Sequence, residues 1–312
     1  NENFLIYYSK ISKFNEKFDK FTFAIFQRYY LGLRESDIIK IFNNFKAAGV
    51  KIIYDIDDFF FEKDYFKKRN YDVSLQYELT KQVEFFIRNS DILSTNNFHI
   101  QKKISKTYNK SSKFIYDIIS STVWGSLDDN KKRLLLKNET YSTRQKKEKF
   151  KIGFLGSYDD KKDLILVKDP IAEINNEIDI IFEIIGTYEY SKATFGKRKG
   201  LPKKKSYPYF INWIKEVSLS WDIGLIPLIS DEDSKYKSNI KFLEYAMLGI
   251  PIIVSESEVY KTIAINERNC LIVQNTPNAW KEAILKLIKN HKLRTYLAEN
   301  AFNDVSSEYF ST

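Results

Sequence analysis

The stretch KSNIKFLEYAMLGIPIIVSE, Lys237 to Glu256, predicts a buried helix that leads directly into a buried strand. Nearly every side chain from Asn239 to Leu248 is apolar, which is typical of a helix that is covered on all sides. Gly249 can adopt the left-handed conformation that ends a helix, and the apolar run IPIIV follows it. A helix joined to a buried strand in this way favours an α/β fold with a parallel sheet.

Two charged side chains, Lys241 and Glu244, interrupt this apolar helix. They are three residues apart and therefore share one face, so a structural ion pair at the surface is one interpretation. The other is a ligand site, because Lys237 and Lys241 flank a helix N-terminus that favours phosphate. The carboxylate of Glu244, one turn deeper, can accept two hydroxyl hydrogen bonds from a sugar. Phosphates beside a ribose describe a nucleotide.

Apolar strand patterns alternate with helical patterns in two blocks of the chain. The first block includes FTFAIFQ (21–27) and KIIYDI (51–56), and extends to KFIYDII (113–119). The second begins at KIGFLG (151–156) and ends with helices from about 277 to 289 and 291 to 305. We expect an N-terminal domain over 1–125, a charged linker over 126–150, a C-terminal domain over 151–290 and a final helix over 291–312.

Composition limits the class of protein. The 312 residues are 43% hydrophobic, which is enough for packed cores, and no run of about 18 apolar residues could span a bilayer. The only cysteine, Cys270, excludes an internal disulfide, so we expect a cytoplasmic protein. A net charge of +9 favours an acidic partner. Because the first residue is Asn1 and not Met, we interpret the chain as a piece of a longer protein.

The set of motifs resembles a known family. KSNIKFLEYAMLGIPIIVS, preceded by WDIGLIPL and followed by ERNCLIVQNTPNAWKEAI, is similar to the donor-binding half of GT-B nucleotide-sugar glycosyltransferases of the group 1, or family 4, class. The resemblance extends from about Lys151 to Ala301. It implies two Rossmann-like α/β domains with parallel sheets that face a cleft, with the acceptor on the N-terminal side and the nucleotide sugar on the C-terminal side.

The resemblance also implies roles for residues of the donor site. Glu244 matches the second Glu of the family's Glu-x7-Glu motif, which holds the ribose hydroxyls. The first Glu of that motif falls at Tyr236, so the contact to the donor sugar departs from the family pattern, and Glu232 or Asp233 are candidate substitutes. The other implied donor-binding residues are Lys237, Ser238, Asn239 and Lys241 near the phosphates, and Gly156 and Ser157 in a glycine turn.

A second candidate site follows the strand KIIYDI. Asp55 and Asp57 share one face, and Asp58 lies on the other. Such carboxylates bind metals, act as acids and bases, or simply cap a turn. The resemblance favours donor-sugar or acceptor contacts for Asp57 and Asp58, which with Lys241 are the predicted catalytic residues. It implies no metal and no cofactor. Arg28 is a candidate contact for the diphosphate or acceptor, or one half of a surface ion pair.

The loop KRKGLPKKK, residues 197–205, has six basic residues in nine. A solvated surface is the ordinary interpretation. Nucleic acid is not an expected partner, because the sequence has no recognition module such as an RRM or a zinc finger. Given the resemblance, we expect this loop to touch anionic lipid or a lipid-linked diphosphate acceptor, as in a peripheral protein at the inner membrane face.

The leading hypothesis is a bacterial-type, metal-independent glycosyltransferase. The resemblance implies that it retains the anomeric configuration of the sugar, as most similar family members do. It would move a sugar from a nucleoside diphosphate sugar to a glycan, lipid-linked or protein acceptor in surface polysaccharide or glycoconjugate synthesis. Two alternatives stay open. One is a non-catalytic nucleotide-sugar-binding module or one domain of a larger polysaccharide synthase, and the other is a GT-B sugar-nucleotide epimerase.

Overall fold

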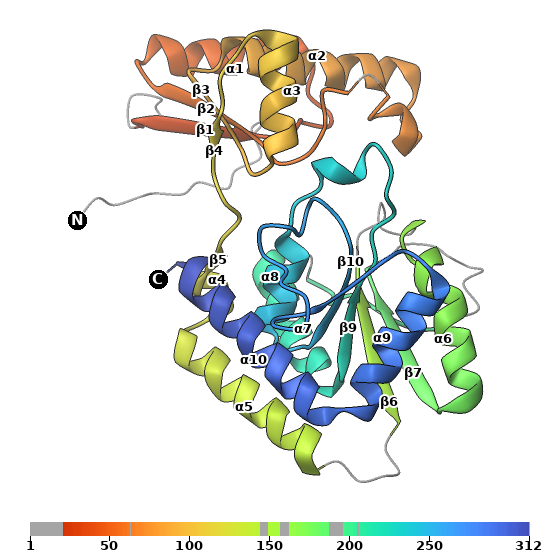
Figure 1. Cartoon of the computed structure of the whole chain (residues 1–312). Helices are drawn as coiled ribbons and strands as arrows, with labels where there is room; N and C mark the ends of the chain where they lie inside the picture. The colour runs from red at the N-terminus through yellow and green to blue at the C-terminus, as the bar shows by residue number, and fades with distance from the viewer. Residues whose placement is uncertain are drawn as a thin grey trace. The chain divides into compact units, whose positions relative to one another are not determined.

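The chain folds into two compact units, Asn1–Tyr116 (unit 1) and Asp117–Thr312 (unit 2). Figure 1 shows the computed structural model, in which each unit has its own sheet and helices. The structure describes residues 21–62, 64–143 (backbone only for 140–143), 149–156, 162–186, 196–204 and 206–311. Ser157, one of the predicted donor-binding residues, lies outside these ranges.

Unit 1 contains a four-stranded parallel sheet in the order β1-β2-β3-β4. Aromatic side chains form much of its core, where the ring of Tyr54 stacks on Phe86 at a centroid distance of 4.9 Å. The N-terminal caps of its helices are local, as Asp72 accepts a hydrogen bond from Leu75 N at 3.0 Å. The elements are β1 (Phe23–Gln27), α1 (Glu35–Ala47), β2 (Lys51–Ile56), α2 (Val73–Asn89), β3 (Ile92–Thr95), α3 (Phe98–Tyr108) and β4 (Lys113–Phe114).

Unit 2 is built on a six-stranded sheet in the order β11-β10-β9-β6-β7-β8, with all pairs parallel. The chain runs outward from β6 to β8 and then returns to place β9 on the other side of β6. This reversal makes the carboxyl ends of β6 and β9 the topological switch point, where ligands bind in open α/β sheets. The strands are β6 (Phe150–Leu155), β7 (Ile180–Ile185), β8 (Lys197–Lys199), β9 (Ile223–Ile226), β10 (Ile252–Ser255) and β11 (Leu271–Val273).

Helices cover both faces of the unit 2 sheet (Figure 1). One face carries α6 and α9, whose core includes Trp280. The other carries α7, α8 and α10, whose core includes Trp221 and Tyr245. Alternate side chains of the strands therefore enter two separate cores, as the apolar runs predicted. The helices are α4 (Ser121–Trp124), α5 (Leu127–Thr143), α6 (Ile165–Glu177), α7 (Tyr207–Val217), α8 (Ile240–Met247), α9 (Pro277–Lys289) and α10 (His291–Glu308).

The stretch predicted to be a charged linker, 126–150, is largely helical, because α5 occupies most of it. This helix packs through polar side chains that hydrogen-bond to carbonyl oxygens at the ends of other helices. Arg133 donates to Met247 O at 2.8 Å, and the buried Lys137 ammonium donates to Ser218 O. Leu135 and Leu136 are each 59% exposed. Leu134 is buried in the core, but these two neighbours face solvent and polar side chains take much of the buried side, so the sequence has no clear core-facing apolar stripe that would predict a helix.

The run KFIYDII (113–119), expected to be one strand, is divided between the two units. Only Lys113 and Phe114 pair with β3, while β5 (Ile119–Ser120) pairs with β12 (Phe310–Ser311) at the end of the chain. Between them, Ile115 and Ile118 are exposed. The apolar pattern was therefore a poor guide here, because these side chains do not enter a sheet core.

Candidate functional site

Helix α8 lies against the switch point of the unit 2 sheet. Its Tyr245 hydroxyl accepts a hydrogen bond from Leu155 N at 2.7 Å and lies 3.3 Å from Leu225 O. One buried phenol thereby joins α8 to the carboxyl ends of both β6 and β9. Gly249, with a φ of 65°, ends the helix and turns the chain into β10, as the sequence predicted.

Glu244 is the buried carboxylate of this site. Its side chain comes from the middle of α8, and the residue is only 8% exposed. Oε1 accepts a hydrogen bond from the Tyr207 hydroxyl at 2.9 Å, at the start of α7. Burial raises the pKa of Glu244 to about 7, against the opposing effects of the Tyr207 hydrogen bond and the Lys241 charge, while Asp117 raises it further. Glu244 therefore changes charge near neutral pH.

The basic residues before and within α8 have different surroundings. Lys237 Nζ lies 3.3 Å from Oδ2 of Asp163, a carboxylate with no exposed surface. Lys241 Nζ lies over the ring of Phe154, 5.6 Å from its centroid. The charge of Lys241 acts on Glu244 and lowers its pKa, as expected for two residues whose i, i+3 spacing puts them on one side of α8.

The start of α8 has the features of an anion site. Asn239 is the N-cap residue, and Ser238 Oγ accepts a hydrogen bond from Ile240 N at 3.4 Å. The N-terminal end of a helix dipole attracts anions, and Lys237 and Lys241 add positive charge beside it.

The glycine turn after β6 is closely packed against the end of β7. Gly156 N donates to Ile185 O at 3.0 Å. Gly186 has a φ of 88°, and a Cβ built on it would lie 2.1 Å from Gly156 O. A glycine is therefore required at position 186 for the two chain segments to approach each other at this edge of the sheet. The structure does not describe the residue that follows, Ser157.

Tyr236 occupies the position where the family pattern has its first Glu. Its side chain is buried, with Lys235 Nζ 5.2 Å from its ring centroid. Of the two candidate substitutes, Glu232 is exposed and Asp233 is half-buried. This part of the site is therefore aromatic where the pattern has a carboxylate.

Two residues of this site carry no signal in the sequence pattern. Tyr207 begins an amphipathic helix, and nothing in that pattern relates it to a carboxylate 37 positions later. Asp163 lies beside the undescribed residues 157–161 and is fully buried, where it also accepts from Ile229 N at 2.8 Å. Only a search for buried partners of Lys237 and Glu244 in three dimensions could identify them.

The acidic residues of unit 1 follow β2, as predicted. Asp57 accepts a bidentate hydrogen bond from the Arg28 guanidinium, with the shortest distance 2.7 Å. Arg28 has a φ of 61°, which is uncommon for a non-glycine residue, and its carbonyl accepts from the Tyr54 hydroxyl at 2.8 Å. These contacts hold the guanidinium against Asp57.

Asp58 is directed toward a different partner. It accepts hydrogen bonds from Phe59 N at 2.7 Å and the Tyr65 hydroxyl at 2.9 Å, and Arg69 lies 3.8 Å away. Burial raises the pKa of Asp58, although these hydrogen bonds and Arg69 oppose the rise. Within the ranges that the structure describes, no group of three His, Cys, Asp or Glu side chains is arranged to hold a metal ion.

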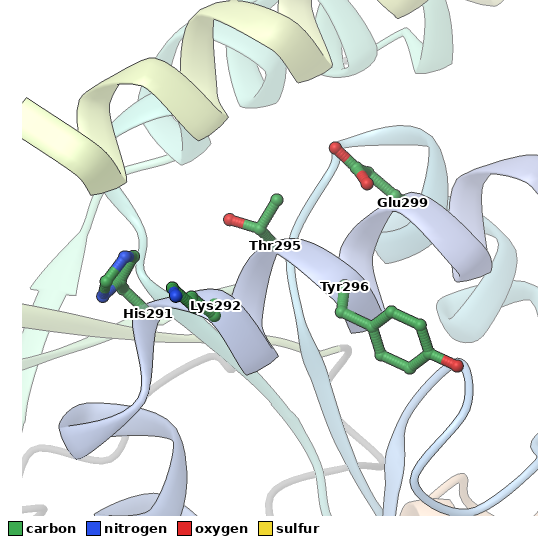
Figure 2. A pocket seen from close by; sticks show the side chains of 5 residues that line it. All are labelled: His291, Lys292, Thr295, Tyr296 and Glu299. Atoms are coloured by element: carbon green, nitrogen blue, oxygen red, sulfur yellow. The ribbon is translucent and has the colours of Figure 1, made fainter.

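A hollow of about 300 Å³ lies along α10. Figure 2 shows its lining, all from one helix: His291, Lys292, Thr295, Tyr296 and Glu299. It contains none of the predicted site residues.

In the part of the chain described here, no helix is long and apolar enough to cross a membrane.

Comparison with known proteins places this geometry in context. The family described as glycosyl transferases group 1 matches residues 137–304, which is more than half of the chain and includes Glu244, Lys237 and Lys241. No curated protein sequence matches the chain.

Solved structures with the GT-B fold are similar to most of the chain, which confirms the predicted fold class. HepE from Anabaena, in complex with UDP and glucose, matches 94% of this chain and 75% of its own, with a TM-score of 0.60 at 12% identity. Sucrose-phosphate synthase from Thermosynechococcus elongatus matches 93% of this chain and 70% of its own, with a TM-score of 0.58 at 11% identity. A variant of TarM from S. aureus, in complex with fondaparinux, alpha-GlcNAc-glycerol and UDP, matches 88% of this chain and 51% of its own. Its TM-score is 0.58 at 12% identity.

Proposed function

Because the chain belongs to the group 1 glycosyl transferases, we propose that it moves a sugar from a nucleoside diphosphate sugar to a glycan or glycoconjugate acceptor. The observation that carries the proposal is the buried Glu244 carboxylate at the sheet's switch point, one turn from a helix N-terminus flanked by Lys237 and Lys241. A buried carboxylate beside an anion site suits a ribose beside a diphosphate.

UDP is the nucleotide we propose for the donor. HepE and TarM, which share the fold, are both described with UDP bound. In this proposal Glu244 accepts hydrogen bonds from the ribose hydroxyls, while Lys237, Ser238, Asn239 and Lys241 surround the phosphates. Gly156 and Ser157 supply the glycine turn near the diphosphate, since a glycine allows close approach of the backbone.

The proposed chemistry needs charge stabilisation more than acid–base catalysis. As the bond between the sugar and the diphosphate breaks, negative charge grows on the departing diphosphate. Lys241 and the N–H groups of α8 stabilise that charge without a metal ion. We assign Asp57 and Asp58 of unit 1 to contacts with the transferred sugar or the acceptor, and we propose retention of the anomeric configuration.

A second candidate function is a non-catalytic nucleotide-sugar-binding module, because Tyr236 replaces the carboxylate that the family pattern places near the donor sugar. Such a module would keep UDP binding and lose sugar transfer. Incubation with a panel of UDP-, GDP-, dTDP- and CMP-sugars separates the two functions. Release of nucleotide or transfer of sugar supports the enzyme, whereas stabilisation by a nucleotide sugar with no turnover supports the module.

We also propose that the protein acts at an anionic membrane surface, in surface polysaccharide or glycoconjugate synthesis. The stretch KRKGLPKKK, predicted as a loop, begins with the edge strand β8. It exposes Lys197, Arg198, Lys203 and Lys204 around an exposed Leu201, a composition that suits acidic lipid headgroups. Its Lys205 lies outside the described residues. Replacing all six basic residues of the loop with Gln should abolish co-sedimentation with vesicles rich in phosphatidylglycerol, and unchanged co-sedimentation would refute the membrane proposal.

The donor site itself is tested by Glu244→Ala. We expect UDP affinity, measured by calorimetry at pH 8, to fall at least about tenfold, as for the loss of a charged hydrogen-bond acceptor. Glu282→Ala, on the exposed face of α9, is the matched control and should bind UDP as the wild type does. A folded Glu244→Ala protein with wild-type affinity would contradict the proposed site.

A further inference from the structure

Glu244 is hydrogen-bonded to a side chain from a neighbouring helix. The Tyr207 phenol, at the start of α7, donates to Oε1 of Glu244 at 2.9 Å. Burial and the charge of Glu244 raise the pKa of this phenol, whereas Trp124, in α4, lowers it. Trp124 is almost fully buried, whereas 47% of Tyr207 is exposed. The hydrogen bond thus links α7 to the carboxylate of the site.

The direction of the hydrogen bond is determined by the carboxylate. An ionised carboxylate can only accept, so the Tyr207 hydroxyl must donate to it. The single phenol proton is then directed to Glu244, whose Oε1 must accept it. A hydrogen bond to a charged acceptor favours the ionised carboxylate. Because the donor has a defined position, the bond also restrains the orientation of the carboxylate.

We propose that Tyr207 is the positioning residue of the donor site: its hydroxyl favours the ionised form of Glu244 and orients the carboxylate to accept the hydroxyl hydrogen bonds of a nucleotide ribose. The inference rests on the proposed function, since it gives Glu244 a ribose to bind. Ribose hydroxyls donate best to a carboxylate, so whatever keeps Glu244 ionised also raises nucleotide affinity.

The charged and titratable groups that face Glu244 set its sensitivity to pH. Burial and Asp117 raise its pKa, and Tyr207 and Lys241 lower it. The net value of about 7 means that Glu244 is half protonated at neutral pH. Loss of the Tyr207 hydroxyl should therefore reduce nucleotide affinity most at low pH, where Glu244 is largely protonated. The reduction should be smallest in alkaline solution, where Glu244 is ionised with or without Tyr207.

The test is UDP affinity of wild-type protein, Tyr207→Phe and Tyr209→Phe, measured by calorimetry from pH 6 to pH 9. Tyr209 is the matched control, because it lies two residues from Tyr207 in the same helix and its hydroxyl accepts a hydrogen bond from Lys204 and not from the site. The ratio of wild-type to variant affinity is the readout at each pH, so the titration of UDP itself cancels.

For Tyr207→Phe we expect the pKa of Glu244 to rise by about one pH unit, the typical effect of one lost hydrogen bond. The affinity ratio should then be about tenfold at pH 6 and fall to about one at pH 9. Tyr209→Phe should give a ratio near one throughout.

Two results would overturn the inference: a ratio for Tyr207→Phe near one at every pH, or a reduced affinity that is the same at every pH. The second outcome would mean that Tyr207 supports the fold of the site and not the charge of Glu244. A wild-type protein that binds no UDP at any pH would instead refute the proposed donor, so failure of the inference and failure of the proposed function give different results.

Discussion

Replacement of Glu244 by Gln should make unit 2 more stable while it weakens nucleotide binding. The folded state holds Glu244 in a buried position, which raises the pKa of its carboxyl from 4.5 to about 7. Gln has nearly the same shape, and its amide oxygen can still accept from Tyr207. The substitution therefore removes the cost of a buried charge without leaving a cavity or an unpaired phenol.

The size of the effect follows from linkage between protonation and folding. Because the folded protein binds a proton that the unfolded chain has lost, wild-type stability falls as the pH rises from about 4.5 to about 7, and this contribution is constant at higher pH. At about 1.36 kcal/mol per pH unit, the full cost is about 3 kcal/mol. Glu244→Gln should raise the free energy of unfolding by up to this amount at pH 8 and by little at pH 5.

Urea unfolding followed by tryptophan fluorescence measures this effect in the relevant unit. All four tryptophans lie in unit 2, at positions 124, 213, 221 and 280, so the signal does not report on unit 1. Glu282→Gln, at an exposed position of α9, serves as the control for removal of a negative charge. A Glu244→Gln protein that is less stable at pH 8, or equally stabilised at pH 5 and pH 8, would refute the reasoning.

Three further predictions concern unit 2. Gly186→Ala should destabilise it by about 2 to 4 kcal/mol in urea melts, because the residue has a positive φ and its Cβ would strike a backbone oxygen, whereas Gly200→Ala, with open space around it, should have little effect. Lys237→Met should cost about 3 kcal/mol at pH 7, since it removes the ammonium beside the buried Asp163, and equal stability would contradict that role. Burial lowers the pKa of Lys137 from 10.5 to about 7, so between these pH values the unfolded chain binds a proton that the folded protein has lost. The free energy of unfolding of the wild type should therefore rise by up to about 5 kcal/mol between pH 7 and pH 10.5. Lys137→Met should flatten this rise in urea melts at pH 7 to 10.

The sequence was informative where one local pattern determined one local structure. The helix ended by Gly249 and the strand KIIYDI both occur where they were predicted, because apolar spacing and a left-handed glycine act over a few residues. Helix α9 has the predicted bounds, Pro277–Lys289, for the same reason. The family resemblance extended these patterns to the fold.

Helix α5 shows why the pattern failed elsewhere. Its buried side includes Lys137, Asn130 and Asn138, and its exposed side includes two leucines. These polar groups are tolerated in the interior because carbonyl oxygens of other elements and a carboxylate of α10 accept their hydrogen bonds. Two of those acceptors, Ser218 and Glu299, are distant in the sequence, so hydrophobic periodicity could not indicate them.

The sequence by itself determined that this protein has parallel α/β units and a helix that carries Lys241 and Glu244 on one side. Only the tertiary structure decided what the two charges experience. It buries Glu244, raises its pKa to about 7 and directs the Tyr207 hydroxyl toward it. The physical reason is that apolar spacing acts between neighbouring residues, whereas desolvation and hydrogen bonding depend on groups that folding brings together from distant parts of the chain.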